Sequence, residues 1–124
     1  MEHRKTEYGY YLKFDKDEKI HSLLEKFMVD QKIAGGFYHG LGALKNAELG
    51  FYHLSKKDYH RETFTDEAEL LNLTGSLTWF NNKPVVHSHV TLGDEKFNAF
   101  GGHLFEADVA VTVELMLTVF KDKI

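Results

Sequence analysis

The sequence predicts a single α+β domain in which one helix accompanies about seven strands of an antiparallel sheet. Only one segment, near the N-terminus, repeats its apolar residues with the period of a helix. Most later segments alternate apolar and polar residues, or are rich in β-branched and aromatic residues, as strands are. The 124 residues fit one domain, and no Pro/Gly/Ser-rich linker or internal repeat divides residues 1–124.

The first two elements are a strand and the helix. Aromatic and aliphatic residues alternate along residues 7–14, which predicts a half-buried strand. Apolar residues then recur at i, i+3, i+4, i+7 and i+8 from Ile20, which predicts one buried helical stripe. Asp15 is expected to be the N-cap, with Glu18 three residues later completing a capping-box-like start. The helix is expected to end near residues 31–32, before two glycines.

The remaining chain predicts strands joined by turns. Lys45-Asn46 and the sequence Asn81-Asn82-Lys83-Pro84 are expected to form turns, and residues 93–95 reverse the chain once more. For residues 109–120 the β-branched residues favour a strand, although the length of the segment also allows a helix. The expected strands after the helix cover residues 34–44, 47–54, 59–64, 69–79, 85–92, 96–100 and 109–120.

Composition excludes several classes of function. The absence of cysteine excludes disulfides, cysteine-based zinc sites and thiol catalysis. The formal net charge is −4 and the basic residues are scattered, so duplex nucleic acid is not an expected partner. No apolar run approaches the roughly 18–20 residues that span a bilayer, so no membrane association is expected. The first residues contain no apolar stretch typical of a secretory signal, and a cytoplasmic location is expected.

The most informative stretch is a His-x-His pair at His87 and His89. On a strand, residues i and i+2 face the same side with Cα atoms about 6.5–7 Å apart, so two imidazoles can converge on one ion. If residues 96–100 pair with this strand, His103 returns toward the pair, and Gly101-Gly102 allows close backbone approach. Three neutral imidazoles suit Zn²⁺ best, with Mn²⁺, Fe²⁺ or Ni²⁺ as alternatives. Two plain surface histidines are the competing interpretation.

Other candidate residues are less specific. Gly40 and Gly42 either allow close packing of a strand or leave room for a ligand, with His39 at its edge. No third glycine or helix start follows them, which excludes a dinucleotide-binding fingerprint. Glu114 is either a solvated residue or a partner that holds a ligand histidine, and Asn72 is a further candidate for a ligand pocket. Solvent exposure is expected for His3, His21, His53 and His60.

Several separated motifs also occur together in one order. They are Gly40-Leu41-Gly42-Ala43-Leu44, residues 69–75, Lys83-Pro84 through His87-Ser88-His89, Gly101-Gly102-His103-Leu104, Glu106-Ala107 and Thr112-Val113-Glu114. In this order they resemble the PPC domain (plants and prokaryotes conserved, formerly a domain of unknown function) over nearly the whole chain. Because the motifs lie in register, the resemblance is specific.

The resemblance implies a strongly bent antiparallel sheet, one main helix, and a homotrimer whose sheets pack across the interfaces. It implies that His87, His89 and His103 form the metal site of the family. It also implies a distant similarity to acetolactate decarboxylase, where a His-x-His and a later His hold catalytic zinc. In plants, PPC domains follow AT-hook segments that bind the DNA minor groove. This chain lacks the Arg-Gly-Arg-Pro core of such segments, so DNA binding is not expected to transfer.

Four functions therefore stay open. The favoured one is a metal-binding homotrimer, with zinc as the preferred ion, that binds a small-molecule ligand or a partner. The alternative is a metal-dependent lyase or hydrolase acting on a small oxo- or hydroxy-acid, with Glu114 and His39 as candidate acid and base. A DNA-associated role is disfavoured, and a purely structural ion that stabilises the trimer is the fourth. The sequence does not identify a substrate.

Overall fold

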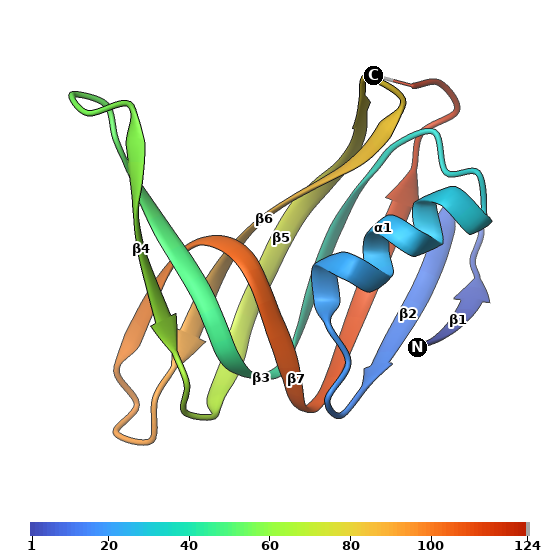
Figure 1. The fold of residues 1–124 in the computed structure, drawn as a ribbon. Coiled ribbons are helices and arrows are strands. Elements are labelled where there is room, and N and C mark those ends of the chain that lie inside the picture. The colour runs from blue at the N-terminus through green and yellow to red at the C-terminus, as the bar shows by residue number, and fades with distance from the viewer. Residues whose placement is uncertain (124) are drawn as a thin grey trace.

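The computed structural model describes residues 1–123 and confirms the α+β class, with one helix and a seven-stranded sheet (Figure 1). All strand pairs are antiparallel. In the described part of the chain, no helix is long and apolar enough to cross a membrane. The elements are β1 (Glu2–Lys5), β2 (Gly9–Asp15), α1 (Ile20–Asp30), β3 (Gly36–His53), β4 (Asp58–Phe64), β5 (Ala68–Phe80), β6 (Lys83–Gly93) and β7 (Ala99–Val119).

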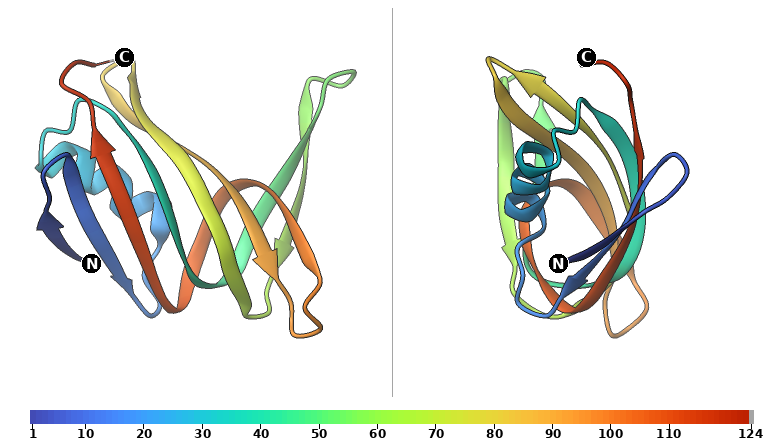
Figure 2. Two further views of the ribbon diagram at one scale, coloured as in Figure 1. Left: turned by 180° about the vertical axis from the view of Figure 1, so that it is seen from behind. Right: turned by 90° about the vertical axis from the view of Figure 1, so that its right-hand side faces the viewer.

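The sheet bends until it closes on itself. Its order is β1-β2-β7-β6-β5-β3-β4, and β7 also pairs with β3, so β3, β5, β6 and β7 form a ring. The first part of β3 pairs with the end of β7, and its second part pairs with the beginning of β7. The bend of the sheet therefore lies within β3 and β7 themselves, since each pairs with the other near both of its ends. The bent strands curve around α1 (Figure 2). The β3–β4 hairpin projects away from the rest of the molecule (Figure 1).

Helix α1 fills the concave side of this sheet with its apolar stripe. Four apolar side chains of the helix are at most 4% exposed and join the core beneath the strands. Burying each of them contributes about 1.5–3 kcal/mol before the entropy of ordering is subtracted. These side chains are Ile20, Leu24, Phe27 and Met28.

The predicted turn at Lys45-Asn46 is wrong, because β3 continues through it. Asn46 takes a positive φ of 51°, and the register with β7 shifts between Lys45 and Glu48. One left-handed residue in a continuous ladder makes a bulge, which bends the strand without reversing it. Asn tolerates this conformation better than most residues do. The turn signal therefore marks the bend of β3.

The last strand is also longer than expected. The loop after β6 extends to Asn98, and β7 begins at Ala99 and continues without interruption to Val119. The expected strands 96–100 and 109–120 are thus parts of one strand, and a helix over 109–120 is excluded. In the β5–β6 hairpin, only Asn81 and Asn82 form the turn, with φ of 51° and 61°, whereas Lys83 and Pro84 already pair with β5. The short β1 was not anticipated.

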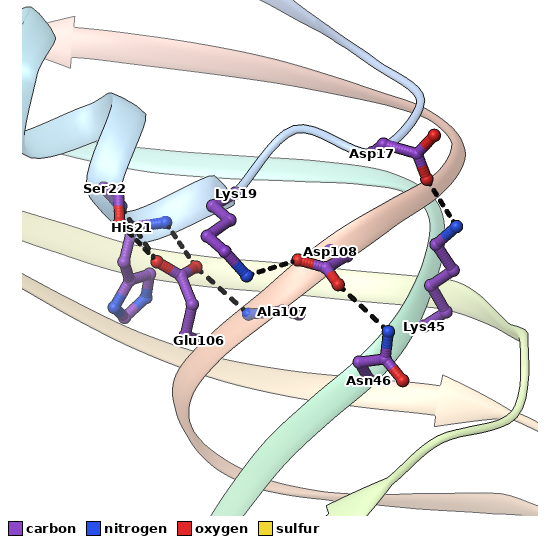
Figure 3. Close-up of polar contacts among 9 residues, drawn as sticks. All are labelled: Asp17, Lys19, His21, Ser22, Lys45, Asn46, Glu106, Ala107 and Asp108. Carbon is purple, nitrogen blue, oxygen red and sulfur yellow. Dashed lines mark hydrogen bonds and ion pairs between the residues drawn. The ribbon is translucent and has the colours of Figure 1, made fainter.

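The helix begins later than predicted, and Asp15 is not its N-cap. Asp15 is the last residue of β2, and a turn with Asp17 at φ 70° separates it from the cap residue Lys19. Glu18 does accept a hydrogen bond from the Asp15 backbone N–H at 2.6 Å, so half of the expected capping box forms in this turn. The first free N–H groups of the helix donate instead to the carboxylate of Glu106 on β7 (Figure 3). A distant acidic residue thus caps the helix, which local sequence could not reveal.

Candidate metal centre

The three predicted ligands come from two neighbouring strands of the ring. His87 and His89 alternate with buried residues on β6 and point to the outer face. His103 on β7 stands directly opposite His89 in the β6–β7 ladder. The pairing predicted from the Gly-Gly step is therefore present: a Cβ on Gly101 would lie 2.1 Å from the carbonyl oxygen of Val90. Only glycine allows the two strands to approach this closely.

The three imidazoles gather closely enough to share one ion. Ligand nitrogens of His87, His89 and His103 all lie within 4.8 Å of one another. The ring centroids are 5.1, 5.3 and 5.7 Å apart. Two nitrogens bound to a tetrahedral zinc at about 2.0–2.1 Å are roughly 3.3–3.4 Å apart, so modest side-chain rotations would complete the site. The His triad could therefore hold a metal ion.

The surroundings of His103 and its lowered pKa are those expected of a metal ligand. Its Nδ1 atom is buried and has no hydrogen-bond partner, the one such side-chain atom within residues 1–123. A buried nitrogen without a partner is costly, and a cation beside this ring would satisfy it. Partial burial lowers the pKa of His103, and the neighbouring charges of His87, His89 and Arg61 lower it further. A lower pKa favours the neutral imidazole, which is the form that binds metals.

An aromatic wall with a cation stands on one side of His103. Tyr59 and Phe105 lie 4.9 and 4.7 Å from its ring, measured between centroids. The guanidinium of Arg61 lies 3.7 Å above the Phe105 ring. Gly50 of β3 pairs with Arg61 on one side and with His103 on the other. The rings of Tyr59 and Phe105 occupy the space that a side chain at position 50 would need. The sequence did not reveal this wall, because Tyr59 and Arg61 lie on β4 whereas Phe105 lies on β7.

On the other side, a shallow hollow of about 180 Å³ borders the His-x-His pair. Thr74 and Ser76 of β5 stand directly opposite His89 and His87 in the ladder, so two hydroxyl groups line the hollow. Phe37 from β3 closes its far side. A ligand at the metal centre would therefore meet hydroxyl groups on this side and a cation on the other.

The pocket candidates occupy different places. His39 is exposed and pairs with Thr74, which in turn pairs with His89, the partner of His103. Thr74 of β5 therefore separates His39 from the triad. Asn72 accepts a hydrogen bond from the Thr74 hydroxyl at 2.7 Å. Gly40 and Gly42 lie where β3 meets β7, and a Cβ there would be 2.3 and 2.1 Å from β7 carbonyl oxygens. These two glycines thus serve close packing, and Gly42 also borders an apolar hollow.

Glu114 and His21 are placed unlike the triad. Glu114 lies on the exposed side of β7 between β2 and β3, where it accepts a hydrogen bond from the Tyr11 hydroxyl at 2.9 Å. His21 was expected to be solvated, but it is only 8% exposed. Burial lowers its pKa to about 4, with Glu106 opposing and His103 and His87 reinforcing the shift. The sequence signal for its burial was its place beside Ile20 and Leu24 on the apolar stripe.

Solved structures of several other proteins share this fold. The "putative DNA-binding protein" of Ralstonia eutropha JMP134 matches 98% of this chain over 84% of its own length, at 29% identity and a TM-score of 0.90. A plant- and prokaryote-conserved (PPC) protein of Pyrococcus horikoshii matches 93% of this chain and 80% of its own, at 31% identity and a TM-score of 0.85. A metal-containing protein of Archaeoglobus fulgidus matches 98% and 86%, at 28% identity and a TM-score of 0.85.

A more distant likeness concerns the fold alone. Acetolactate decarboxylase of Bacillus subtilis subspecies spizizenii is 19% identical, with a TM-score of 0.60, and the match covers 90% of this chain and 53% of the enzyme. No curated protein sequence matches the chain significantly. The model of the Plants and Prokaryotes Conserved (PCC) domain matches residues 1–121, which bears out the resemblance of the sequence motifs. This chain belongs to the PCC domain family.

Proposed function

We propose that this protein is a homotrimer that binds one divalent metal ion, preferably zinc, per chain and presents it to a small ligand. The observation that carries the proposal is the convergence of His87, His89 and His103, with a buried and unpartnered nitrogen on His103. Three imidazoles supply three of the four ligands of a tetrahedral zinc ion and leave the fourth position for water or a ligand. The metal-containing relative from Archaeoglobus fulgidus is consistent with this function.

Metal content of the untagged protein tests the proposal. We expect about one zinc per chain in the wild type after reconstitution, and none in a variant with all three histidines changed to alanine. A His53→Ala/His60→Ala variant removes two imidazoles of the β3–β4 hairpin and should keep the metal. Zinc in all three proteins would assign it to another place on the chain, and zinc in none would refute the metal centre.

The proposed trimer is supported by apolar side chains that nothing within residues 1–123 covers. Leu71, Phe97 and Val111 are 54%, 96% and 66% exposed and border a hollow of about 520 Å³. Exposed apolar patches of this kind mark association surfaces. We expect light scattering to give three times the 14.3 kDa chain mass. Val111→Glu should dissociate the assembly, whereas Phe80→Glu, the same change at the exposed β5–β6 turn, should not. A monomeric wild type would refute this part.

A second candidate function is a metal-dependent lyase or hydrolase that acts on a small oxo- or hydroxy-acid. Arg61 favours it, because a half-exposed guanidinium beside the triad can pair with the carboxylate of such an acid. A bound divalent ion would supply Lewis-acid polarisation of the acid's oxygen atoms. Arg61 would orient the carboxylate, and Thr74 and Ser76 would offer hydroxyl groups to the remainder. His39, which Thr74 separates from His89, is the nearer candidate acid or base, whereas Glu114 lies between β2 and β3, away from the triad. Turnover that His89→Ala abolishes would establish this function.

A DNA-associated role is supported by the name of the Ralstonia eutropha relative, a "putative DNA-binding protein". The net charge of −4 opposes it, because affinity for duplex DNA rests on neutralised phosphates. We expect no salt-dependent retardation of duplex DNA at physiological ionic strength. Retardation that weakens steeply with added salt would revive the role.

A further inference from the structure

Two buried polar side chains meet directly behind the three candidate ligands. They are His21 and Ser88, which are 8% and 0% exposed. The Nε2 atom of His21 lies 2.7 Å from the Ser88 hydroxyl oxygen. Ser88 separates His87 from His89, and because side chains alternate along a strand, it points inward while both histidines point outward. One inward contact thus holds β6 between its two candidate ligands.

Tyr38 extends this contact to the backbone of a candidate ligand. Its hydroxyl is hydrogen-bonded to the Ser88 hydroxyl and donates to the carbonyl oxygen of His87 at 3.2 Å. The contact requires glycine at position 75, because a Cβ there would lie 2.3 Å from the Tyr38 hydroxyl oxygen. The polar groups of His21, Ser88 and Tyr38 therefore fix the peptide that joins His87 to Ser88.

The same helical turn is hydrogen-bonded to β7, the strand that contains His103. The Glu106 carboxylate on β7 accepts from the His21 N–H at 2.8 Å, the Ser22 N–H at 3.0 Å and the Ser22 hydroxyl at 2.9 Å (Figure 3). Glu106 follows His103 closely on β7. The first turn of α1 is thus joined to β6 between two candidate ligands, and to β7 just beyond the third.

These bonds occur where the β6–β7 ladder ends. Its last pair is Ser88 with Leu104, so His87 has a partner on β5 but none on β7. The ladder alone sets His89 against His103, but it does not fix His87 relative to His103. Beyond the last pair, the connection between the strands runs through the start of α1.

We infer that the first turn of α1 is a clamp that sets the position of His87 relative to His103, with His21, Ser88 and Glu106 as positioning residues. The inference rests on the proposed metal centre. Groups that orient metal ligands from behind typically change affinity about 10-fold to 100-fold when they are removed. A network that served stability alone would leave metal affinity and geometry unchanged.

Metal affinity and the visible spectrum of the Co²⁺-substituted protein separate these two roles. We expect Ser88→Ala and His21→Leu to weaken zinc binding about 10-fold or more, measured by competition with a chromophoric chelator, and to alter the Co²⁺ bands. His21→Gln should restore much of the affinity, because its amide can reach the position of Nε2. Thr112→Val is the matched control, since it removes one hydroxyl hydrogen bond, to the carbonyl oxygen of Phe14, away from the site.

The outcomes distinguish the clamp from the metal centre. A wild type that binds no metal would overturn both. A wild type that binds zinc, with Ser88→Ala and His21→Leu equal to it in affinity and spectrum, would overturn the clamp alone. If Thr112→Val weakens zinc binding as much as Ser88→Ala at an equal loss of apoprotein stability, the effect is general destabilisation and the clamp is also refuted. Urea unfolding of the metal-free proteins supplies that comparison.

Discussion

Acid should destabilise this protein through one buried histidine, His21. Its pKa is lowered from 6.5 to about 4, chiefly by burial. As the pH falls, the unfolded chain therefore binds a proton at this residue before the folded protein does. The stability that neutral His21 contributes is complete above pH 6.5 and is lost as the pH falls toward 4. The linkage relation gives a loss of about 1.4 kcal/mol at pH 5.5 and about 2.5 kcal/mol at pH 4.5.

The perturbation that isolates this effect is His21→Gln, which keeps a polar group near Ser88 but does not titrate. We measure the free energy of unfolding in urea on metal-free protein at fixed concentration. As the pH is lowered, it should decrease less steeply in the variant than in the wild type. The gap between the two proteins should shrink by about 1.4 kcal/mol from pH 7.5 to pH 5.5. The other titrating groups are common to both proteins, so they cancel in this difference. Parallel pH profiles would show that His21 is protonated with its ordinary pKa, and the reasoning would fail.

Three further predictions concern the backbone that shapes the sheet. Gly75→Ala should cost more than about 2 kcal/mol in urea unfolding, because the new Cβ would meet the His87 carbonyl oxygen at 2.2 Å. Gly42→Ala should cost at least as much, since φ is 153° and the Thr112 carbonyl oxygen is 2.1 Å away; Gly93→Ala, which meets only the Leu71 side chain at 3.3 Å, should cost far less. Asn46→Val should lower the melting temperature more than Asn46→Gly, because φ is 51° there, and equal effects would refute a strained bulge.

The local patterns of the sequence predicted the local structure well. The helical stripe that starts at Ile20 is buried as expected, and the His-x-His spacing places both imidazoles on one face. The prediction of about seven strands is close to the seven observed, but its ranges number eight and divide the chain differently. Two pairs of expected strands are single long strands, because Asn46 and the stretch after Gly102 bend the chain without reversing it. A turn residue looks the same in a bulge and in a hairpin, and only the pairing partner decides between them.

The contacts behind the His triad could not be predicted, because they join segments that are distant in the sequence. Glu106 caps a helix that begins more than eighty residues earlier, and His21 meets Ser88 across 67 residues. Neither pair leaves a spacing pattern in the sequence. The wall of Tyr59, Phe105 and Arg61 has the same origin, since its members meet only when β4 and β7 flank β3.

The period of two along β6 links the candidate metal centre to the core. Ser88 is buried because His87 and His89 are not, so a one-residue slip of β6 would turn both imidazoles inward and expose the serine. The contacts of Ser88 with His21 and Tyr38 exist in one register only, and they oppose such a slip from the inside. A buried polar pair costs free energy unless it is satisfied, so it penalises the wrong register more than an apolar residue would. The residue that holds the strand and the two candidate ligands are therefore selected by the same alternation.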